Sequence, residues 1–160
     1  MELELLTGTF ETTLDDKNRV VVPASLREHY TGALYLIRGV EKCVWVMTPD
    51  NYYKKLEDFR EQAQTKGFNA GQIDAFYYQH VTTRHKVEVD VKTGRIQVPA
   101  PLKSYAKLEK DCLVVCSRDH LEIWNTELNN DFMEEVRIVN KDIHNKMSAR
   151  ADFLPGAGQE

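Results

Sequence analysis

The stretch Leu14-Asp15-Asp16-Lys17-Asn18-Arg19-Val20-Val21-Val22-Pro23-Ala24-Ser25-Leu26-Arg27 decides the fold, because a second version of it occurs later in the same chain. That version reads Asp90-Val91-Lys92-Thr93-Gly94-Arg95-Ile96-Gln97-Val98-Pro99-Ala100-Pro101-Leu102-Lys103. From the arginine onward the two stretches align without gaps. Each consists of a polar turn, an apolar strand, and a proline that can start a short helix. The chain therefore contains one duplicated supersecondary motif.

The turn at the head of each stretch has residues that suit a reversal of the chain. Asn18 tolerates a positive φ angle, and Gly94 stands at the matching place in the second stretch. Apolar and threonine-rich residues 6–14 precede the first turn, and residues 19–22 follow it with β-branched side chains. This order predicts a β-hairpin.

The remaining segments follow the same order in both halves, ending in a second strand pair and a long helix. Further strands are expected at 34–37, 44–47, 87–89, 113–116 and 121–124, and helices at 23–30 and 69–80 and from Thr48 and Thr126 onward. Two equivalent sets of short strands favour an α+β fold that is mainly β, a small closed barrel of two interlocking halves with helices outside. We expect one domain, residues 1–150, made of repeats at about 5–80 and 81–150, with a flexible tail at 151–160.

Composition narrows the class of protein. With 160 residues, of which 42% are hydrophobic and 29% charged, the chain has the balance of an ordinary globular domain. No apolar run approaches the roughly 18 residues of a membrane span, and the acidic start Met1-Glu2-Leu3-Glu4 differs from the basic start of an export signal. Three cysteines without a Cys-x-x-Cys pair favour reduced core thiols. We therefore expect a cytoplasmic protein that does not associate with membranes.

Cations gather at the two motifs although the formal net charge is −4. A negative net charge argues against attraction to nucleic acid by the overall charge of the protein, but it allows one face of the protein to be cationic. Arginine can bond guanine O6 and N7 together, lysine supplies a point charge to phosphate, and a two-stranded ribbon fits the major groove. A solvated hairpin tip would explain either cluster alone, whereas two aligned clusters favour a surface that reads an anion twice. The cations are Lys17, Arg19 and Arg27 in the first motif and Lys92, Arg95 and Lys103 in the second.

An acid–base site is the second candidate. Asp15, Asp16 and Asp90 could share a proton if they were buried together, yet they are expected in exposed turns beside cations. No nucleophile or Gly-rich phosphate loop lies near them in the sequence. Trp45 and Trp124 occupy neighbouring places in the two repeats and are interpreted as core aromatics. We expect no enzyme, no cofactor and no small-molecule substrate.

A metal site is the third candidate. Cys112, Cys116 and His120 follow one another at steps of four, and tetrahedral zinc sites usually have tighter paired spacing. His80 and His85 do not have the spacing of zinc ligands either. Core thiols and surface histidines are the stronger interpretation, so we expect no metal.

The doubled motif resembles the MraZ family of bacterial transcriptional regulators. The resemblance rests on the Asp15–Arg19 turn, the Val20–Ala24 segment and the second segment Gly94–Ala100, and it extends over about residues 4–147. It implies a duplicated swapped-hairpin barrel of the AbrB-like kind, and a ring-shaped, octamer-like homo-oligomer. It also implies a regulator on the nucleoid that binds double-stranded DNA at short direct repeats upstream of its own operon, the division and cell-wall gene cluster. Asp15 and Arg19 would take part in DNA binding.

The second motif departs from the family pattern. Asp90 precedes Arg95 by five positions instead of four, and Val91 occupies the expected acidic place. One extra residue in a tight turn changes its type or adds a bulge. The family role therefore carries over to Arg95 and leaves the role of Asp90 open, whereas Asp15 is placed to orient its arginine.

The resulting hypothesis is a DNA-binding regulator in which Arg19 and Arg95 read bases. The other motif cations, Lys17, Lys92, Arg27 and Lys103, would contact phosphates. Acidic residues would hold the long helices away from DNA, namely Glu57, Asp58, Glu61, Asp131, Glu134 and Glu135. Apolar stripes on those helices exceed what a small barrel needs, which predicts assembly beyond a dimer. The alternative is an antitoxin-like or other protein-interaction module on the same barrel, whose long helices grip a partner protein.

Overall fold

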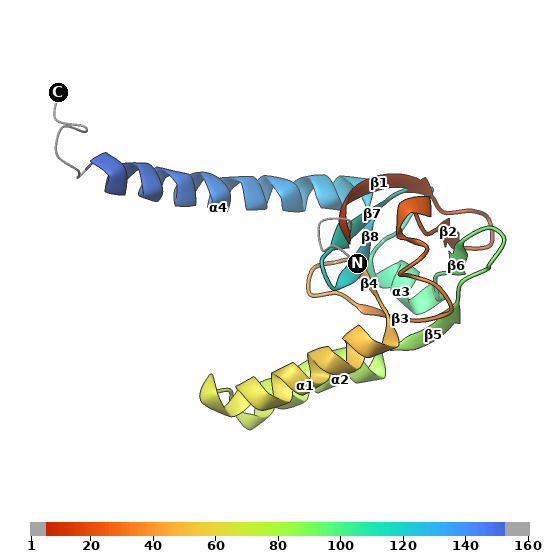
Figure 1. Ribbon diagram of the computed structural model, residues 1–160, viewed down its shortest axis with the longest axis horizontal. Coiled ribbons are helices and arrows are strands. Elements are labelled where there is room, and N and C mark those ends of the chain that lie inside the picture. The colour runs from red at the N-terminus through yellow and green to blue at the C-terminus, as the bar shows by residue number, and fades with distance from the viewer. Residues whose placement is uncertain (1–5, 153–160) are drawn as a thin grey trace. The chain divides into compact units, whose positions relative to one another are not determined.

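A computed structural model describes residues 6–152 of the chain (Figure 1). The chain divides into two compact units, one ending at Thr126 and one beginning at Glu127. The strands are β1 (Thr7–Thr13), β2 (Arg19–Val21), β3 (Ala33–Arg38), β4 (Val44–Met47), β5 (His85–Glu88), β6 (Arg95–Gln97), β7 (Asp111–Ser117) and β8 (His120–Asn125). The helices are α1 (Pro49–Thr65), α2 (Ala70–Thr82), α3 (Ala100–Tyr105) and α4 (Thr126–Asp152), with a 3₁₀ turn, η2, at Ala24–Leu26.

The strands form a six-stranded sheet in the order β1-β7-β8-β4-β3-β5 and a separate two-stranded ribbon, β2–β6. The halves interleave, because β1 pairs with β7, β3 with β5, β4 with β8, and β2 with β6. This interleaving agrees with two interlocking repeats, and the fold is α+β with mostly strand in its sheets. Among the described strands, β1 and β5 remain sheet edges while β2 and β6 pair with each other. The pairing therefore does not show the closed barrel expected from the sequence.

An apolar core lies between the ribbon and one face of the sheet. Val20 and Ile96 oppose each other in the ribbon and are buried in this core. Each buried aliphatic side chain contributes about 1.5–3 kcal/mol, so a core drawn from both halves holds the ribbon and its turns in place. The sheet contributes, among others, Leu34, Leu36, Val44, Val46, Val114, Leu121 and Ile123.

The prolines of the two motifs start unequal helices. Pro99 precedes the α-helix α3, whereas Pro23 precedes only the three-residue η2 and a series of turns. The helix predicted over 23–30 is therefore wrong in its extent. A physical reason lies at the second helical position, where Pro101 fixes a helical φ angle and Ser25 does not.

α1 and α2 begin where the sequence predicts. The Thr48 hydroxyl caps α1, and Asn69 forms a capping box with Gln72 at the start of α2. α2 continues farther than predicted, so Val81, expected to open the second repeat, is helical. β5 consequently begins at His85.

The second unit consists of α4 from Glu127 onward. α4 extends to Asp152, so the first two residues of the predicted tail at 151–160 are helical, and residues 153–160 lie outside the described residues. No helix within residues 6–152 is long and apolar enough to cross a membrane.

Candidate nucleic-acid interface

The first turn, residues 15–19, holds Arg19 by means of Asp15. Oδ1 of Asp15 accepts hydrogen bonds from the backbone amides of Lys17 and Arg19, each at 2.9 Å. Oδ2 accepts one from Nε of Arg19 at 2.8 Å. The Arg19 amide and then the other donors of this turn hold the pKa of Asp15 below its usual value. The geometry agrees with the expectation that Asp15 orients Arg19.

The second turn, residues 90–95, is one residue longer and lacks this arrangement. Oδ1 of Asp90 accepts hydrogen bonds from the amides of Thr93 at 3.0 Å and Lys92 at 2.9 Å, and both bonds lower the pKa of Asp90. The amide of Arg95 donates instead to the Thr93 hydroxyl at 3.3 Å. Within residues 6–152, no hydrogen bond or ion pair links the Arg95 side chain to a carboxylate.

Thr93 is a turn residue that the sequence interpretation missed. Its amide donates to the acid of the turn and its hydroxyl accepts from the arginine amide, so it substitutes for the direct acid–arginine contact of the first turn. A threonine between the acid and the arginine was the available signal, because its hydroxyl commonly bonds nearby backbone in turns. The predicted positive φ angles are confirmed, at 60° for Asn18 and 73° for Gly94.

Both arginines lie on the outward face of the β2–β6 ribbon. Arg19 opposes Gln97, and Val21 opposes Arg95. The arginines are therefore diagonal neighbours with Cα atoms about 7–8 Å apart. The residues between them, Val20 and Ile96, point inward because side chains alternate along a strand. The duplication thus brings two guanidinium groups to one small surface.

Each turn is also bound by the other repeat. The amide of Val22 donates to the carbonyl oxygen of Gly94 at 2.8 Å. The amide of Val98 donates to the carbonyl oxygen of Asn18, also at 2.8 Å. These equivalent bonds relate the two motifs by a local twofold arrangement.

The cation that follows each proline reaches toward the other repeat's turn. Nζ of Lys103 donates to Oδ1 of Asn18 at 2.9 Å. Nε of Arg27 donates to the Val22 carbonyl oxygen at 2.9 Å, and a Cβ added to Gly94 would lie 2.6 Å from Cζ of Arg27. Arg27 and Lys103 therefore brace the turns in addition to placing positive charge beside them.

The other charged turn residues are exposed. Lys17 and Lys92 occupy corresponding places in the turns, and Asp16 is exposed beside the first of them. Asp15 and Asp90 each accept backbone amides of their own turn. Each carboxylate is therefore engaged in holding its turn, and the geometry offers no shared proton between acids.

The structure separates the cysteines from His120. Cys112 and Cys116 are buried in the core, their Sγ atoms donate to backbone carbonyl oxygens, and burial raises the pKa of both thiols to about 11. Cys116 opposes Leu121, so the neighbouring His120 lies on the other face of the sheet. Among residues 6–152, no group of three or more His, Cys, Asp or Glu side chains could hold a metal ion.

The prediction of surface histidines is wrong for His80 and His120, which are 4% and 7% exposed. Nδ1 of His120 lies 2.8 Å from Asp119 Oδ1, and Nε2 lies 2.9 Å from Glu122 Oε2. Burial lowers the pKa of His120, but hydrogen bonds to the two carboxylates outweigh burial and raise it above its ordinary value. The two carboxylates thus make burial of a charged histidine possible.

The tryptophans are buried as predicted. Trp45 and Trp124 are 7% and 2% exposed. The Trp45 ring lies 4.1 Å from the ring of His120, centroid to centroid, and the Trp124 indole donates to Glu122 at 2.9 Å. The Trp45 ring thus packs against His120, and because both tryptophans are buried neither ring is available to stack on bases.

Comparison with known proteins finds relatives of the duplicated motif. The family described as "MraZ protein, putative antitoxin-like" matches this chain at residues 5–71 and 82–151. Each matched segment contains one of the two turns. The Transcriptional regulator MraZ of Micrococcus luteus is 33% identical over 131 residues, which cover 82% of this chain and 88% of that protein.

Proposed function

Because the chain belongs to the MraZ family, we propose that it is a sequence-specific DNA-binding transcriptional regulator. The observation that carries the proposal is the placement of Arg19 and Arg95 on the outward face of one two-stranded ribbon. A two-stranded ribbon fits the major groove, and an arginine fork matches guanine O6 and N7. The name of the Micrococcus luteus relative, a transcriptional regulator, supports the same function.

The two arginines read bases, and the surrounding cations position the protein on the phosphates. Lys17 and Lys92 contribute from exposed places in the turns. Arg27 and Lys103 add charge at the turn bases, where they also brace the backbone. The interleaved ribbon and sheet form a swapped-hairpin barrel in this proposal, supported by the reciprocal bonds between the motifs.

The DNA target consists of short direct repeats upstream of the protein's own operon, the division and cell-wall gene cluster. A ring-shaped, octamer-like homo-oligomer would set several ribbons against successive repeats. Linked binding events need only modest affinity at each repeat, because every event after the first is intramolecular. The protein would act on the nucleoid.

The test is a titration of the purified protein with a labelled duplex from the region upstream of its gene. Saturable binding is expected, with log affinity falling against log salt at a slope of about −0.9 for each phosphate contacted. A shuffled duplex of the same composition is the control and should bind more weakly. An antitoxin-like or other protein-interaction role would instead give no preference for the upstream duplex and a specific partner in a pull-down.

A further inference from the structure

The outward face of the β2–β6 ribbon carries two residues besides the arginines. Gln97 lies directly across from Arg19, and Val21 lies directly across from Arg95. The residues between them along each strand are buried, so the other four side chains point outward. Opposed Cβ atoms lie about 4.5–5.5 Å apart, and outward residues of one strand follow one another at about 6–7 Å. The four side chains therefore span about two base-pair steps, at roughly 3.4 Å for each step.

The two halves of this face are not identical. The local twofold arrangement makes Arg19 equivalent to Arg95, and it makes Val21 equivalent to Gln97. The arginines therefore present the same chemistry twice, whereas an apolar side chain at one place corresponds to an amide at the other. A protein surface with exact twofold symmetry matches a palindromic site. The difference between Val21 and Gln97 thus gives the ribbon a direction along the DNA.

The polar groups needed to contact bases are free on the half that contains Gln97. Gln97 is exposed, and its side-chain amide forms no hydrogen bond within residues 6–152. The amide therefore keeps both its donors and its acceptor for a ligand. Across the ribbon, Asp15 engages Nε of Arg19, while the two terminal nitrogens of Arg19 form no hydrogen bond in the same part of the chain. An amide and a guanidinium group side by side can each make a bidentate contact to a base.

We infer that Gln97 and Val21 are specificity-determining residues when the ribbon lies in the major groove. Gln97 bonds N6 and N7 of an adenine next to the guanine that Arg19 binds. Val21 packs against the C5-methyl group of a thymine next to the guanine that Arg95 binds. The two halves of the DNA site therefore differ, and the site has one preferred direction. The inference rests on the proposed function, because it requires DNA in contact with this ribbon.

The assignment of Gln97 is tested by selection of duplexes from a randomised library. The wild-type protein should prefer adenine at one position by about 5- to 150-fold, the range for one good bidentate contact. Gln97→Glu keeps the shape of the side chain, but a carboxylate cannot donate to adenine N7 and accepts from cytosine N4. The preference at that position should change from adenine to cytosine, and the guanine preferences should remain. The added charge weakens binding to every duplex alike, so it does not alter these ratios.

The assignment of Val21 is tested with uracil, which lacks only the C5-methyl group of thymine. In the selected duplex, uracil at the position that Val21 contacts should lower the affinity of the wild-type protein about fourfold, as for one buried CH₂ group. Val21→Ala should bind the thymine and uracil duplexes equally. Uracil at thymines outside the selected site should change the affinity of neither protein.

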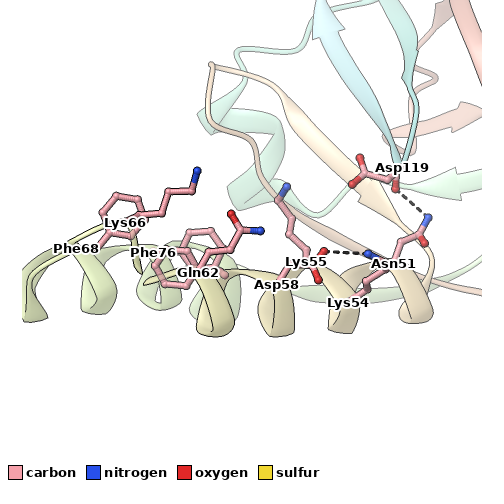
Figure 2. Close-up of a pocket in the computed structure, with 10 residues that line it drawn as sticks. Asn51, Lys54, Lys55, Asp58, Gln62, Lys66, Phe68, Phe76 and Asp119 are labelled. Carbon is pink, nitrogen blue, oxygen red and sulfur yellow. Dashed lines mark hydrogen bonds and ion pairs between the residues drawn. The ribbon is translucent and has the colours of Figure 1, made fainter. Parts of the chain in front are cut away.

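Gln62→Glu is the matched control for Gln97→Glu. Gln62 lines a groove of about 490 Å³ along α1, and Figure 2 shows its side chain on that helix. The same change of charge on this other element should leave every base preference as in the wild type. Circular dichroism melts check that each variant is folded. Because Gln97 is exposed, Gln97→Glu should melt at the temperature of the wild-type protein.

Three results would overturn the inference. Specific binding whose base preferences are the same in the wild type and in Gln97→Glu would overturn the role of Gln97 and leave the proposed function intact. A loss of affinity with uracil that persists in Val21→Ala, or no loss in the wild type, would overturn the role of Val21 in the same way. A wild-type protein that enriches no sequence would overturn the proposed function and this inference with it.

Discussion

Nζ of Lys103 donates a hydrogen bond to Oδ1 of Asn18 at 2.9 Å, although 85 positions separate the two residues. The reciprocal relation places Arg27 of the first repeat against Gly94 of the second. Each turn is thus held by the repeat to which it does not belong. The geometry of one turn should therefore respond to substitutions in the other repeat.

A double-mutant cycle measures this dependence. Lys103→Ala removes the donor, and Asn18→Gly removes the acceptor while keeping a residue that accepts positive φ. We expect the two changes to be non-additive by about 0.5–1.5 kcal/mol in unfolding free energy, the usual net value of one hydrogen bond. Strict additivity in urea titrations would mean that the bond contributes nothing to turn stability.

The two acids should differ in DNA binding. Asp15→Ala frees the Arg19 side chain, because Oδ2 of Asp15 is the acceptor for its Nε. Asp90→Ala should leave the Arg95 side chain as it was, since within residues 6–152 the Asp90 carboxylate accepts the amides of Lys92 and Thr93 and no hydrogen bond from Arg95. We expect the larger loss of affinity from Asp15→Ala, measured at one fixed salt concentration. Equal losses would show that both acids act only by holding turn backbone.

The two arginines should behave alike. If each makes a bidentate contact to a base, Arg19→Ala and Arg95→Ala should each cost about 1–3 kcal/mol and relax specificity at one position of the site. Competition with duplexes that carry single base changes gives both quantities. Full binding by Arg19→Ala would remove the basis of the proposed recognition.

Gly94 of the second turn should be harder to replace by alanine than Gly67, which has the same φ angle. Its φ is 73°, and an added Cβ would meet the Arg27 side chain. Gly67 has the same φ of 73° with nothing within 4 Å of such a Cβ, so Gly67→Ala measures backbone strain alone, about 1–2 kcal/mol. Gly94→Ala should destabilise more than that control in thermal melts. Adding Arg27→Ala should recover the difference; no recovery would assign the whole cost to φ.

Stability should depend on pH through His120. Its pKa is raised in the folded state, so its contribution is complete below the ordinary value of 6.5 and is lost as pH rises through the folded pKa. Deprotonation leaves Asp119 and Glu122 without the cation between them. Denaturation midpoints across this window should fall for the wild type and stay level for His120→Gln. Parallel curves would show that His120 does not titrate there.

Local backbone features could be predicted because the responsible residues are adjacent in sequence. Asn18 and Gly94 indicate positive φ, and Thr48 and Asn69 indicate helix starts, through interactions that span only a few positions. The acid–arginine spacing likewise indicates that Asp15 and Asp90 act differently. Each of these features is present in the structure.

The features that could not be predicted depend on partners distant in sequence. The pairing of β2 with β6 sets Arg19 diagonally from Arg95, and no local pattern specifies that register. Burial of His120 depends on Trp45, whose ring packs over the imidazole from another strand, whereas its carboxylate partners Asp119 and Glu122 are close in sequence. The short helix predicted after Pro23 is an exception with a local cause, because Ser25 stands where α3 has Pro101 and the chain forms only a 3₁₀ turn there.

The reciprocal bonds of Val22 with Gly94 and of Val98 with Asn18 have a consequence for half-length chains. A polypeptide carrying one motif would leave its amide donor unsatisfied and its ribbon strand without a mate. Two such polypeptides could form a dimer in which each chain stands in for one repeat. The strand amide of each chain would then donate to a turn carbonyl oxygen of the other. The tandem arrangement makes that exchange intramolecular, so the paired motifs remain together at any protein concentration. Fusion also frees the two turns to differ in length, as they do here, whereas identical chains would have to carry identical turns.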